Sequence, residues 1–342
     1  MKKNRLKKIT TIIFLSFNIC LINACEKSDV KKVNKEFVQD KELAFVYSHA
    51  FKPETFILKT NDLETFKKYT YKINDITELN IDTKKNLHMF SKHEPYFYSL
   101  NKDDMKLEKK QLKDPYTFYI KDDEISIESY NQDLNNNILK VKDNKYNKEY
   151  SMNFTPYLEL AFYDNNYIYI CHNDAYENKS FLHIIKRDNG EKFKSLEIDN
   201  HPENYAFFKD KIILSTENKL TIINKESWDI QYKDYSFNDG IADKLYVDEN
   251  KKLYITYVDE KMNAYIAILN DSFEWEKNTN LKFPYMKSEF LNDKIYILSQ
   301  IEDNNKYGGI LGVFDIKTLK KIEEIKIPKS ESRVQDFVII DK

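Results

Sequence analysis

A strand-rich unit recurs along the chain at nearly constant spacing, and this repeat limits the possible folds more than any other feature. From residue 42 onward, short runs of Ile, Tyr, Phe and Val alternate with clusters of Asn, Asp and Lys. This pattern is typical of β-strands separated by turns. Neighbouring units lie 37 to 44 residues apart, measured between one equivalent position in each: Phe45, His88, Ile125, Tyr169, Ile213, Tyr254 and Tyr296.

A spacing near 42 residues with four strands per unit is typical of β-propeller blades. Six units have a strand just before the equivalent position, at residues 77–81, 117–120, 158–162, 205–208, 244–247 and 288–291. The first unit lacks this strand, whereas the chain ends with a solitary strand at residues 334–340. We therefore expect an all-β fold, a seven-bladed β-propeller closed by a C-terminal strand that completes the first blade. Such closure leaves no open inner edge.

Some of the units also carry a recognisable motif. The segment Val313-Phe-Asp-Ile-Lys-Thr-Leu-Lys resembles the YVTN and quinoprotein-like propeller repeats, and diverged copies begin at Phe181 and Lys219. This resemblance implies the propeller fold and no particular activity. Trp228-Asp229 is similar to the dipeptide of WD40 repeats, but it falls in the turn after the third strand, which is the wrong register.

The first 24 residues have the composition of an export signal. Five positive charges lie in residues 2–8, and an interrupted apolar stretch follows from Ile9 to Ile22, as in secretory signals. The stretch is shorter than the roughly 20 apolar residues that a membrane-spanning helix needs. It ends in Leu21-Ile-Asn-Ala-Cys25, which resembles the lipobox of bacterial lipoproteins, with Ile22 and Asn23 departing from its usual residues.

The lipobox resemblance implies that Cys25 is diacylated and becomes the new N-terminus. Two acyl chains suffice for stable anchoring, so we expect attachment to the outer face of the cell membrane. The expected organisation is a signal peptide at residues 1–24, Cys25 with a flexible tether at 25–41, and the propeller domain at 42–342. The alternatives are plain secretion with Cys25 as a spare thiol, and a permanent N-terminal membrane span.

Charge and cysteine content limit the partners. The chain carries −2, and loss of the five positive charges of the signal leaves −7, which argues against nucleic acid, because its binding needs a basic face. Only Cys171 would remain free after export, so we expect no internal disulfide. We expect a monomer. Frequent Asn, Lys and Ile favour an AT-rich genome, as in low-GC Gram-positive bacteria.

Ligands of propellers usually dock on the face where two sets of loops gather. The first set joins second to third strands, at residues 48–54, 91–96, 129–137, 171–180, 215–218, 258–262 and 299–308. The second set joins the blades, at 113–116, 153–157, 199–204, 236–242, 282–286 and 327–333. We expect prolines to fix bends in the interblade turns: Pro115, Pro156, Pro202, Pro284 and Pro328.

Histidine, acidic and aromatic residues in these loops are the candidate binding residues: His49, Phe51, His93, Tyr96, Tyr130, His172, Asp174, Tyr176, Glu177, His201 and Tyr307. Tyrosine gives contact area at low entropic cost, although chance exposure would give a similar set. The four histidines could share a metal or haem only if they converged to bonds of about 2 Å, and their blades are too far apart. His88 and His183 lie within strands and are expected to be packed.

No catalytic residue is predicted from motifs. The sequence has neither a glycine-rich phosphate loop nor a Gly-x-Ser-x-Gly elbow, and Cys171 and His172 should point to opposite sides of a strand. We therefore expect a non-catalytic binding module, without cofactor, for a protein, peptide or glycan. The alternatives are a hydrolase or lyase that uses a carboxylate pair and a carrier of haem, metal or quinone. The acids in question are Asp174, Glu177, Glu302 and Asp303.

Overall fold

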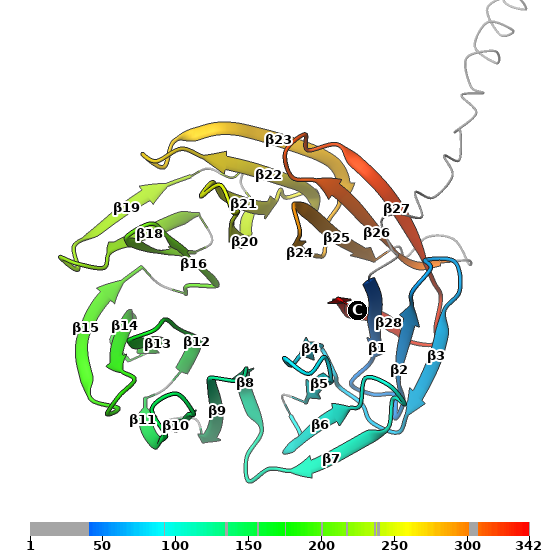
Figure 1. Ribbon diagram of the computed structural model, residues 1–342, viewed down its shortest axis with the longest axis horizontal. Coiled ribbons are helices and arrows are strands. Elements are labelled where there is room, and N and C mark those ends of the chain that lie inside the picture. Colours follow the sequence, from blue (N-terminus) through cyan, green and yellow to red (C-terminus); the bar gives the residue numbers. More distant parts are fainter. Residues whose placement is uncertain are drawn as a thin grey trace, which may run out of the picture. The chain divides into compact units, whose positions relative to one another are not determined.

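The computed structural model describes residues 41–91, 93–133, 136–155, 157–174, 176–199, 201–216, 218–235, 237, 240–300 and 307–341. These residues form seven four-stranded antiparallel sheets arranged in a ring (Figure 1). The seven-bladed β-propeller expected from the repeat is thus confirmed. Each equivalent position, from Phe45 to Tyr296, lies in the second strand of its blade. The signal, Cys25 and most of the tether lie outside the described residues.

The strands of each blade are given from the centre outward. Blade 1 contains β28 (Arg333–Asp341), β1 (Lys41–Ser48), β2 (Thr55–Thr60) and β3 (Lys67–Tyr71). Blade 2 contains β4 (Asn80–Ile81), β5 (Leu87–Phe90), β6 (Tyr96–Leu100) and β7 (Leu107–Gln111). Blade 3 contains β8 (Tyr116–Lys121), β9 (Ile125–Asp133), β10 (Asn136–Asp143) and β11 (Lys148–Phe154).

The other four blades follow in chain order. Blade 4 contains β12 (Tyr157–Tyr163), β13 (Tyr167–Asp174), β14 (Lys179–Lys186) and β15 (Lys192–Ile198). Blade 5 contains β16 (Asn204–Phe208), β17 (Lys211–Ser215), β18 (Lys219–Asn224) and β19 (Ile230–Asp234). Blade 6 contains β20 (Ile241–Val247), β21 (Leu253–Val258), β22 (Asn263–Leu269) and β23 (Trp275–Pro284). Blade 7 contains β24 (Lys287–Leu291), β25 (Lys294–Gln300), β26 (Tyr307–Asp315) and β27 (Lys321–Pro328).

The ring closes where the first and last described strands, β1 and β28, meet in blade 1. β28 pairs antiparallel with β1 along the whole of that strand, with Phe45 opposite Phe337 and their rings stacked at a centroid distance of 6.2 Å. The buried carboxylate of Asp336 accepts a hydrogen bond from the Leu79 N–H at 2.9 Å and pairs with Lys287 of β24 at 2.5 Å. One side chain on the closing strand therefore ties blade 1 to both of its neighbours.

The core is divided among the seven interfaces between blades, each of which has its own cluster of buried apolar residues. Successive side chains of a strand point to opposite faces of the sheet, so each blade contributes to two clusters. In β1, for example, Ala44 and Val46 pack toward blade 2, whereas Phe45 and Tyr47 pack toward blade 7. This alternation explains why nearly continuous apolar runs form the second strands.

One arginine is completely buried between blades 3 and 4. Arg187 is 0% exposed; its Nε donates a hydrogen bond to Asp143 at 2.6 Å, and its Nη1 donates to the Asp164 carbonyl at 2.7 Å. The guanidinium also lies 3.3 Å from Glu124 and 4.9 Å from the centroid of the Tyr163 ring. Because these partners come from both blades, the charge links them on the face opposite the β13–β14 hairpin.

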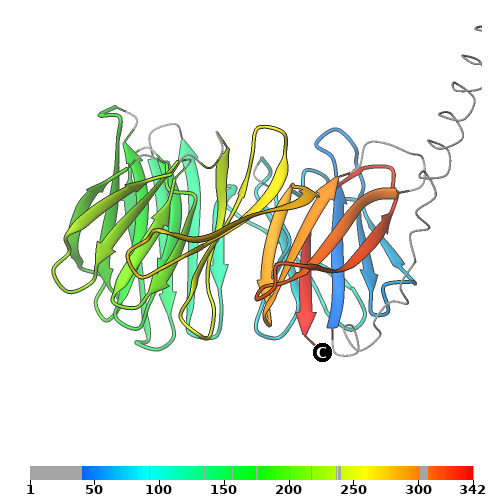
Figure 2. The same ribbon diagram turned by 90° about the horizontal axis from the view of Figure 1, so that it is seen from above.

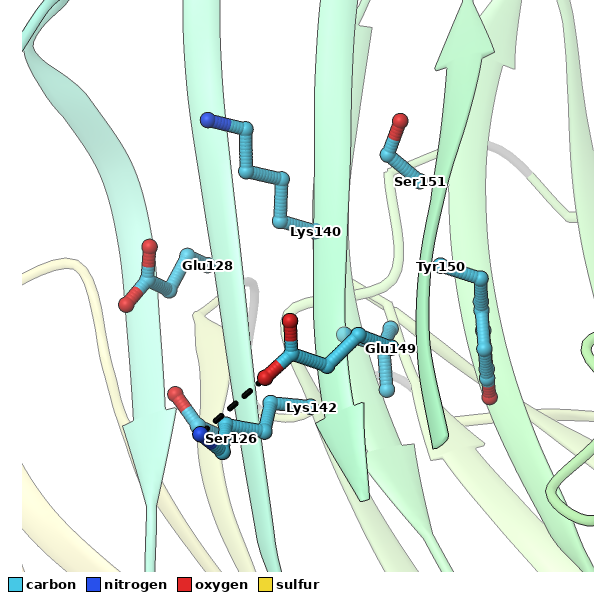
Figure 3. A pocket seen from close by; sticks show the side chains of 8 residues that line it. Ser126, Glu128, Lys140, Lys142, Glu149, Tyr150 and Ser151 are labelled. Carbon is cyan, nitrogen blue, oxygen red and sulfur yellow. Dashed lines mark ion pairs between the residues drawn. The ribbon is translucent and has the colours of Figure 1, made fainter. Parts of the chain in front are cut away.

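The interface between blades 2 and 3 differs from the others. Its buried cluster is small and mostly aromatic, and includes Phe97, Tyr116 and Tyr130. Farther out, the side of blade 3 that faces blade 2 is polar, and its side chains line a groove of about 400 Å³. Figure 3 shows this groove, with Lys142 paired to Glu149 at 3.0 Å.

Strand lengths differ from the prediction in two hairpins. The β9–β10 hairpin was expected to be open from residue 129 to 137, but β9 continues to Asp133 and β10 begins at Asn136. Likewise, β13 continues to Asp174, although the sequence predicted a loop from residue 171. Pro115 and Pro202 lie in interblade turns, whereas Pro284 and Pro328 end β23 and β27. Pro156 lies outside the described residues.

Candidate functional site

The hairpins between second and third strands and the turns between blades lie together on one side of the ring, which we call the loop face. Figure 2 shows the ring edge-on, with the β1–β2 hairpin on the side opposite the end of β28. This arrangement follows from the topology, because antiparallel strands return to the same side after every second connection. The candidate binding residues were chosen for this face.

Large apolar side chains are exposed unevenly over the described residues. Five of them lie on the loop face: Phe51, Tyr157, Tyr176, Ile241 and Met262. The other three lie on outermost strands: Phe193, Tyr232 and Ile322. Phe51 and Tyr176 are the most exposed, at 92% and 72%. Among the described residues, the hairpins of the opposite face contribute none, so the loop face is the side with unburied contact area.

Glu159 occupies a β-bulge at the inner rim of blade 4. In the pairing of β12 with β13, Leu158 lies opposite His172 and Leu160 lies opposite Cys171, so Glu159 has no partner residue. A bulge redirects its side chain and is common beside functional sites. The Glu159 Oε1 lies 2.6 Å from His201 Nδ1, while Oε2 is buried without a hydrogen-bond partner. Burial raises the pKa of this carboxyl despite His201.

His201 and Asn173 complete this group, which we call the blade 4 rim (Glu159, Asn173, His201). His201 lies in the turn between blades 4 and 5 at φ 55°, and the Asn173 amide lies 3.2 Å from its ring nitrogens. His201 remains largely exposed. The rim therefore presents an imidazole to solvent, backed by a partly buried carboxylate, which is an arrangement able to bind a polar ligand or to move a proton.

His172 was expected on the rim, but it is buried in β13. Its Nε2 lies 2.6 Å from the Thr155 carbonyl, and its Nδ1 lies 3.3 Å from Nε2 of His183. The other nitrogen of His183 lies 2.8 Å from the Ser195 hydroxyl. These contacts form one continuous chain of hydrogen bonds, and burial lowers the pKa of His183 to about 4. His183 is packed as predicted, and so is His88.

Blade 4 also departs from the pattern of the other blades. Near the loop end of their second strands, six blades carry a buried hydroxyl residue: Ser48, Ser91, Ser129, Ser215, Thr256 and Ser299. At this position blade 4 has His172. A residue type shared by six blades serves the common fold, for example where the Ile76 N–H donates to Ser48 Oγ at 3.0 Å. The exception marks blade 4 as a specialised part of the ring.

Asp174, Tyr176 and Glu177 lie together in the β13–β14 hairpin. Oδ1 of Asp174 accepts hydrogen bonds from the N–H groups of Tyr176 at 3.0 Å and Glu177 at 3.2 Å. Side chains of Asp stabilise turns in this way. The turn holds the exposed Tyr176 at the tip of the hairpin, so five predicted residues, including His172 and His201, come from blade 4 and its following turn.

The remaining predicted residues belong to other blades. In blade 1, His49 Nδ1 accepts a hydrogen bond from the Phe51 N–H at 3.1 Å, and the two rings lie 5.7 Å apart. In blade 2, His93 bonds to Asp75. These histidines do not converge with His172 or His201, and the described residues contain no cluster of three or more metal-ligating side chains.

The three predicted tyrosines have different environments. Tyr96 begins β6, with Lys109 Nζ 3.4 Å above its ring. Tyr130 was predicted to lie in a loop, but it is a 7% exposed residue of β9, whose hydroxyl bonds to Glu128. Its ring fills the aromatic interface between blades 2 and 3, so it cannot belong to a recognition surface. Tyr307 begins β26 and lines a pocket.

This pocket lies at the seam where blades 7 and 1 meet, and has a volume of about 500 Å³. We call it the seam pocket; its lining includes His49, Lys52, Tyr307, Lys329, Ser332 and Arg333. His49 and Tyr307 were predicted, whereas Lys52, Lys329 and Arg333 were missed, because Lys52 lies far from the other two in sequence. Glu159 and Asn173 were missed for another reason, since a β-bulge has no sequence signature here.

The free cysteine adds nothing to the candidate site. Cys171 is buried, and burial raises the pKa of its thiol. It packs between blades 4 and 5, away from His172. Glu302 and Asp303 lie outside the described residues. No helix among the described residues is long and apolar enough to cross a membrane.

No protein-family model matches the sequence. The chain is 30% identical over 306 residues to YeeG, an uncharacterised protein of Bacillus subtilis (strain 168), across 89% of this chain and 87% of YeeG. A solved protein of unknown function from Desulfotomaculum acetoxidans has a TM-score of 0.57 at 14% identity, covering 86% of this chain and 98% of that one.

Two further solved structures have the same TM-score of 0.57. Sqt1 of Saccharomyces cerevisiae is 9% identical, with 88% of each chain covered. The dihydro-heme d1 dehydrogenase NirN, solved in complex with DHE, is 10% identical, with 84% of this chain and 73% of NirN covered. Identities this low show a shared fold and nothing about activity.

Proposed function

We propose, from the premise that this chain belongs to the family of the Bacillus subtilis protein YeeG, that it is a lipid-anchored extracytoplasmic binding protein. In this proposal, its loop face holds a protein, peptide or glycan without transforming it. The observation that carries the proposal is the uneven exposure of apolar side chains, of which five lie on the loop face and none in the described hairpins of the opposite face.

Two of these side chains have the properties of binding anchors. Tyr176 and Phe51 have exposed rings, and the backbone N–H of each donates a hydrogen bond within its hairpin, to Asp174 and His49 respectively. Aromatic residues dominate binding energy at interfaces when their positions are fixed in advance. Exposed rings do not stabilise the unbound protein. Covering them with a partner contributes roughly 1.5–3 kcal/mol of favourable free energy for each large side chain buried.

The binding proposal is tested with photo-crosslinking residues placed at single positions of the full chain in living cells. Positions 51 and 176 should give one shared crosslinked product. Positions 193 and 232 are the matched controls, because Phe193 and Tyr232 are also exposed but lie on outermost strands. Equal crosslinking at all four positions, or none at 51 and 176, would contradict a specific surface there.

The proposed location at the outer face of the membrane is supported by the N-terminal sequence, where Ile9 to Ile22 and Cys25 follow the pattern of a lipoprotein signal. Changing Cys25 to Ser should remove the lipid and release the protein into the soluble extracellular or periplasmic fraction. Fractionation followed by protein detection measures this directly. If the Cys25→Ser protein stays in the membrane fraction, another element anchors it.

A second candidate function, an extracytoplasmic hydrolase or lyase, is favoured by the blade 4 rim. Glu159 combines a raised pKa with an unpartnered Oε2 and a contact to His201, which suits general acid–base chemistry. Turnover of a glycan, ester or peptide by residues 26–342 that falls at least a hundredfold in Glu159→Gln would support it. Turnover unaffected by that change would exclude these residues as the catalytic pair.

A further inference from the structure

The seam pocket concentrates positive charge on an otherwise acidic chain. Among the described residues, Lys52, Lys329 and Arg333 line it, together with one carboxylate, Glu331. That carboxylate is neutralised by Lys68, which lies outside the lining and pairs with it at 2.7 Å. The hydrogen bond from Lys68 lowers the pKa of Glu331 to about 2. Among the described lining residues there are therefore three cations and one acid, and that acid is already paired with Lys68.

The lysines retain donors for a ligand. Lys52 donates one hydrogen bond to the Glu331 carbonyl, which places its ammonium at the pocket, and an ammonium has three N–H donors. Lys329 has no carboxylate within ion-pair distance among the described residues. The positions of both side chains are thus compatible with an additional acceptor, which no described carboxylate supplies to Lys329.

A buried hydroxyl adds the second, independent observation. Ser332 lines the pocket and is 9% exposed, and its Oγ has no hydrogen-bond partner. A buried polar group without a partner costs about 1–3 kcal/mol of stability, and most such groups in proteins are satisfied. Its neighbour Ser330 has a partner, since its Oγ donates to Glu331 at 2.9 Å. A ligand oxygen in the pocket that accepts a hydrogen bond from Ser332 Oγ would explain why this hydroxyl has no partner within the protein.

We propose that the seam pocket binds a phosphate group, either free or as the head of a phosphate ester. Lysine and arginine cations with a hydroxyl donor are the groups that proteins use to hold phosphate oxygens. The pocket volume of about 500 Å³ lies in the usual range for small-molecule sites and exceeds what the phosphate alone needs. Tyr307 and Gly308 line it beside the cations and leave room for an organic part. This site goes beyond the aromatic surface of the proposed function and does not depend on it.

The proposal is tested by isothermal titration calorimetry on purified residues 26–342, at constant ionic strength set with chloride. The probes are inorganic phosphate and glycerol 3-phosphate. Saturable binding of inorganic phosphate alone identifies free phosphate, and tighter binding of glycerol 3-phosphate identifies an ester; either result supports the site. Absence of saturable binding for both probes overturns it.

Variants separate a built site from general charge attraction. Lys52→Gln and Lys329→Gln should each weaken binding about tenfold, as expected for loss of one hydrogen bond to a charged group. The matched control is Lys261→Gln, which removes the same charge from the β21–β22 hairpin of the loop face and should leave the affinity unchanged. Equal losses in Lys261→Gln and Lys329→Gln would show non-specific attraction and overturn the proposal.

Ser332→Ala gives a readout that a structural role would not give. The change keeps the charge and removes a hydroxyl that has no partner, so the melting temperature of the ligand-free protein should stay the same or rise. The phosphate affinity should fall several-fold. A ligand-free protein that is destabilised, with unchanged phosphate affinity, would mean that Ser332 serves the fold and would overturn its place in the site.

Discussion

One buried histidine of blade 4, His183, makes the stability of the propeller sensitive to acid. His183 is held neutral because burial, then Lys192 and His172, lowers its pKa to about 4, compared with about 6.5 in an unfolded chain. Below pH 6.5 the unfolded chain binds a proton at this position and the folded chain does not. The stabilising contribution is therefore complete above pH 6.5 and is lost as the pH falls from 6.5 to 4.

The size of the effect follows from the difference between the two pKa values. Each unit corresponds to about 1.4 kcal/mol, so the contribution of His183 is about 3 kcal/mol over this interval. Its ring is almost entirely buried and lies tilted against the Phe154 ring at a centroid distance of 5.3 Å, which keeps solvent screening small. A change of this size is a large part of the usual 5–15 kcal/mol that stabilises a protein.

Urea denaturation at pH values from 7.5 to 4, for wild type and His183→Gln, measures the contribution. The wild type should lose about 3 kcal/mol more than the variant over this range, because the variant has no imidazole to titrate. His49→Gln is the control, since His49 is an exposed histidine of the loop face, and should follow the wild type. A difference between wild type and His183→Gln that stays constant within 1 kcal/mol would refute the reasoning.

Two further predictions concern the fold. Arg187→Met should lower the free energy of unfolding by about 3–5 kcal/mol, because Asp143 then keeps a buried charge without its partner. Thermal unfolding measures this loss. Adding Asp143→Asn to the variant should recover part of it. Deleting residues 331–342 removes β28, including Val334 and Phe337, at a cost of roughly 1.5–3 kcal/mol for each large apolar side chain. A truncated chain that melts like the parent would contradict ring closure by this strand.

The repeat could be predicted from the sequence because the blade core is built from local alternation. Phe45 and its six equivalents all lie in second strands, where apolar runs are long enough to be recognised. The closing strand was also predictable, since residues 334–340 have strand composition and the first unit lacked one strand. Both inferences rely on the order of the units along the chain, because the blades of a propeller follow one another around the ring in that same order.

The candidate site was less predictable because its geometry depends on details that residue type does not encode. Tyr130 was assigned to a loop because Asn131, Gln132 and Asp133 are polar, yet these residues extend β9. His172 was assigned to the rim because no local pattern shows that its ring would meet His183 of the neighbouring strand. The bulge at Glu159 and the convergence of Lys52 with Lys329 arise from packing between distant segments.

The pairing of β28 with β1 has a consequence for how the protein is made. Six blades consist of consecutive segments and can form in order as the chain lengthens, whereas blade 1 needs its earliest and its latest strand together. β1 must therefore wait, with one edge unpaired, until the nine residues of β28 have been synthesised. Closure thus acts as a check of completeness: a chain that stops early keeps an exposed strand edge and is a substrate for proteases.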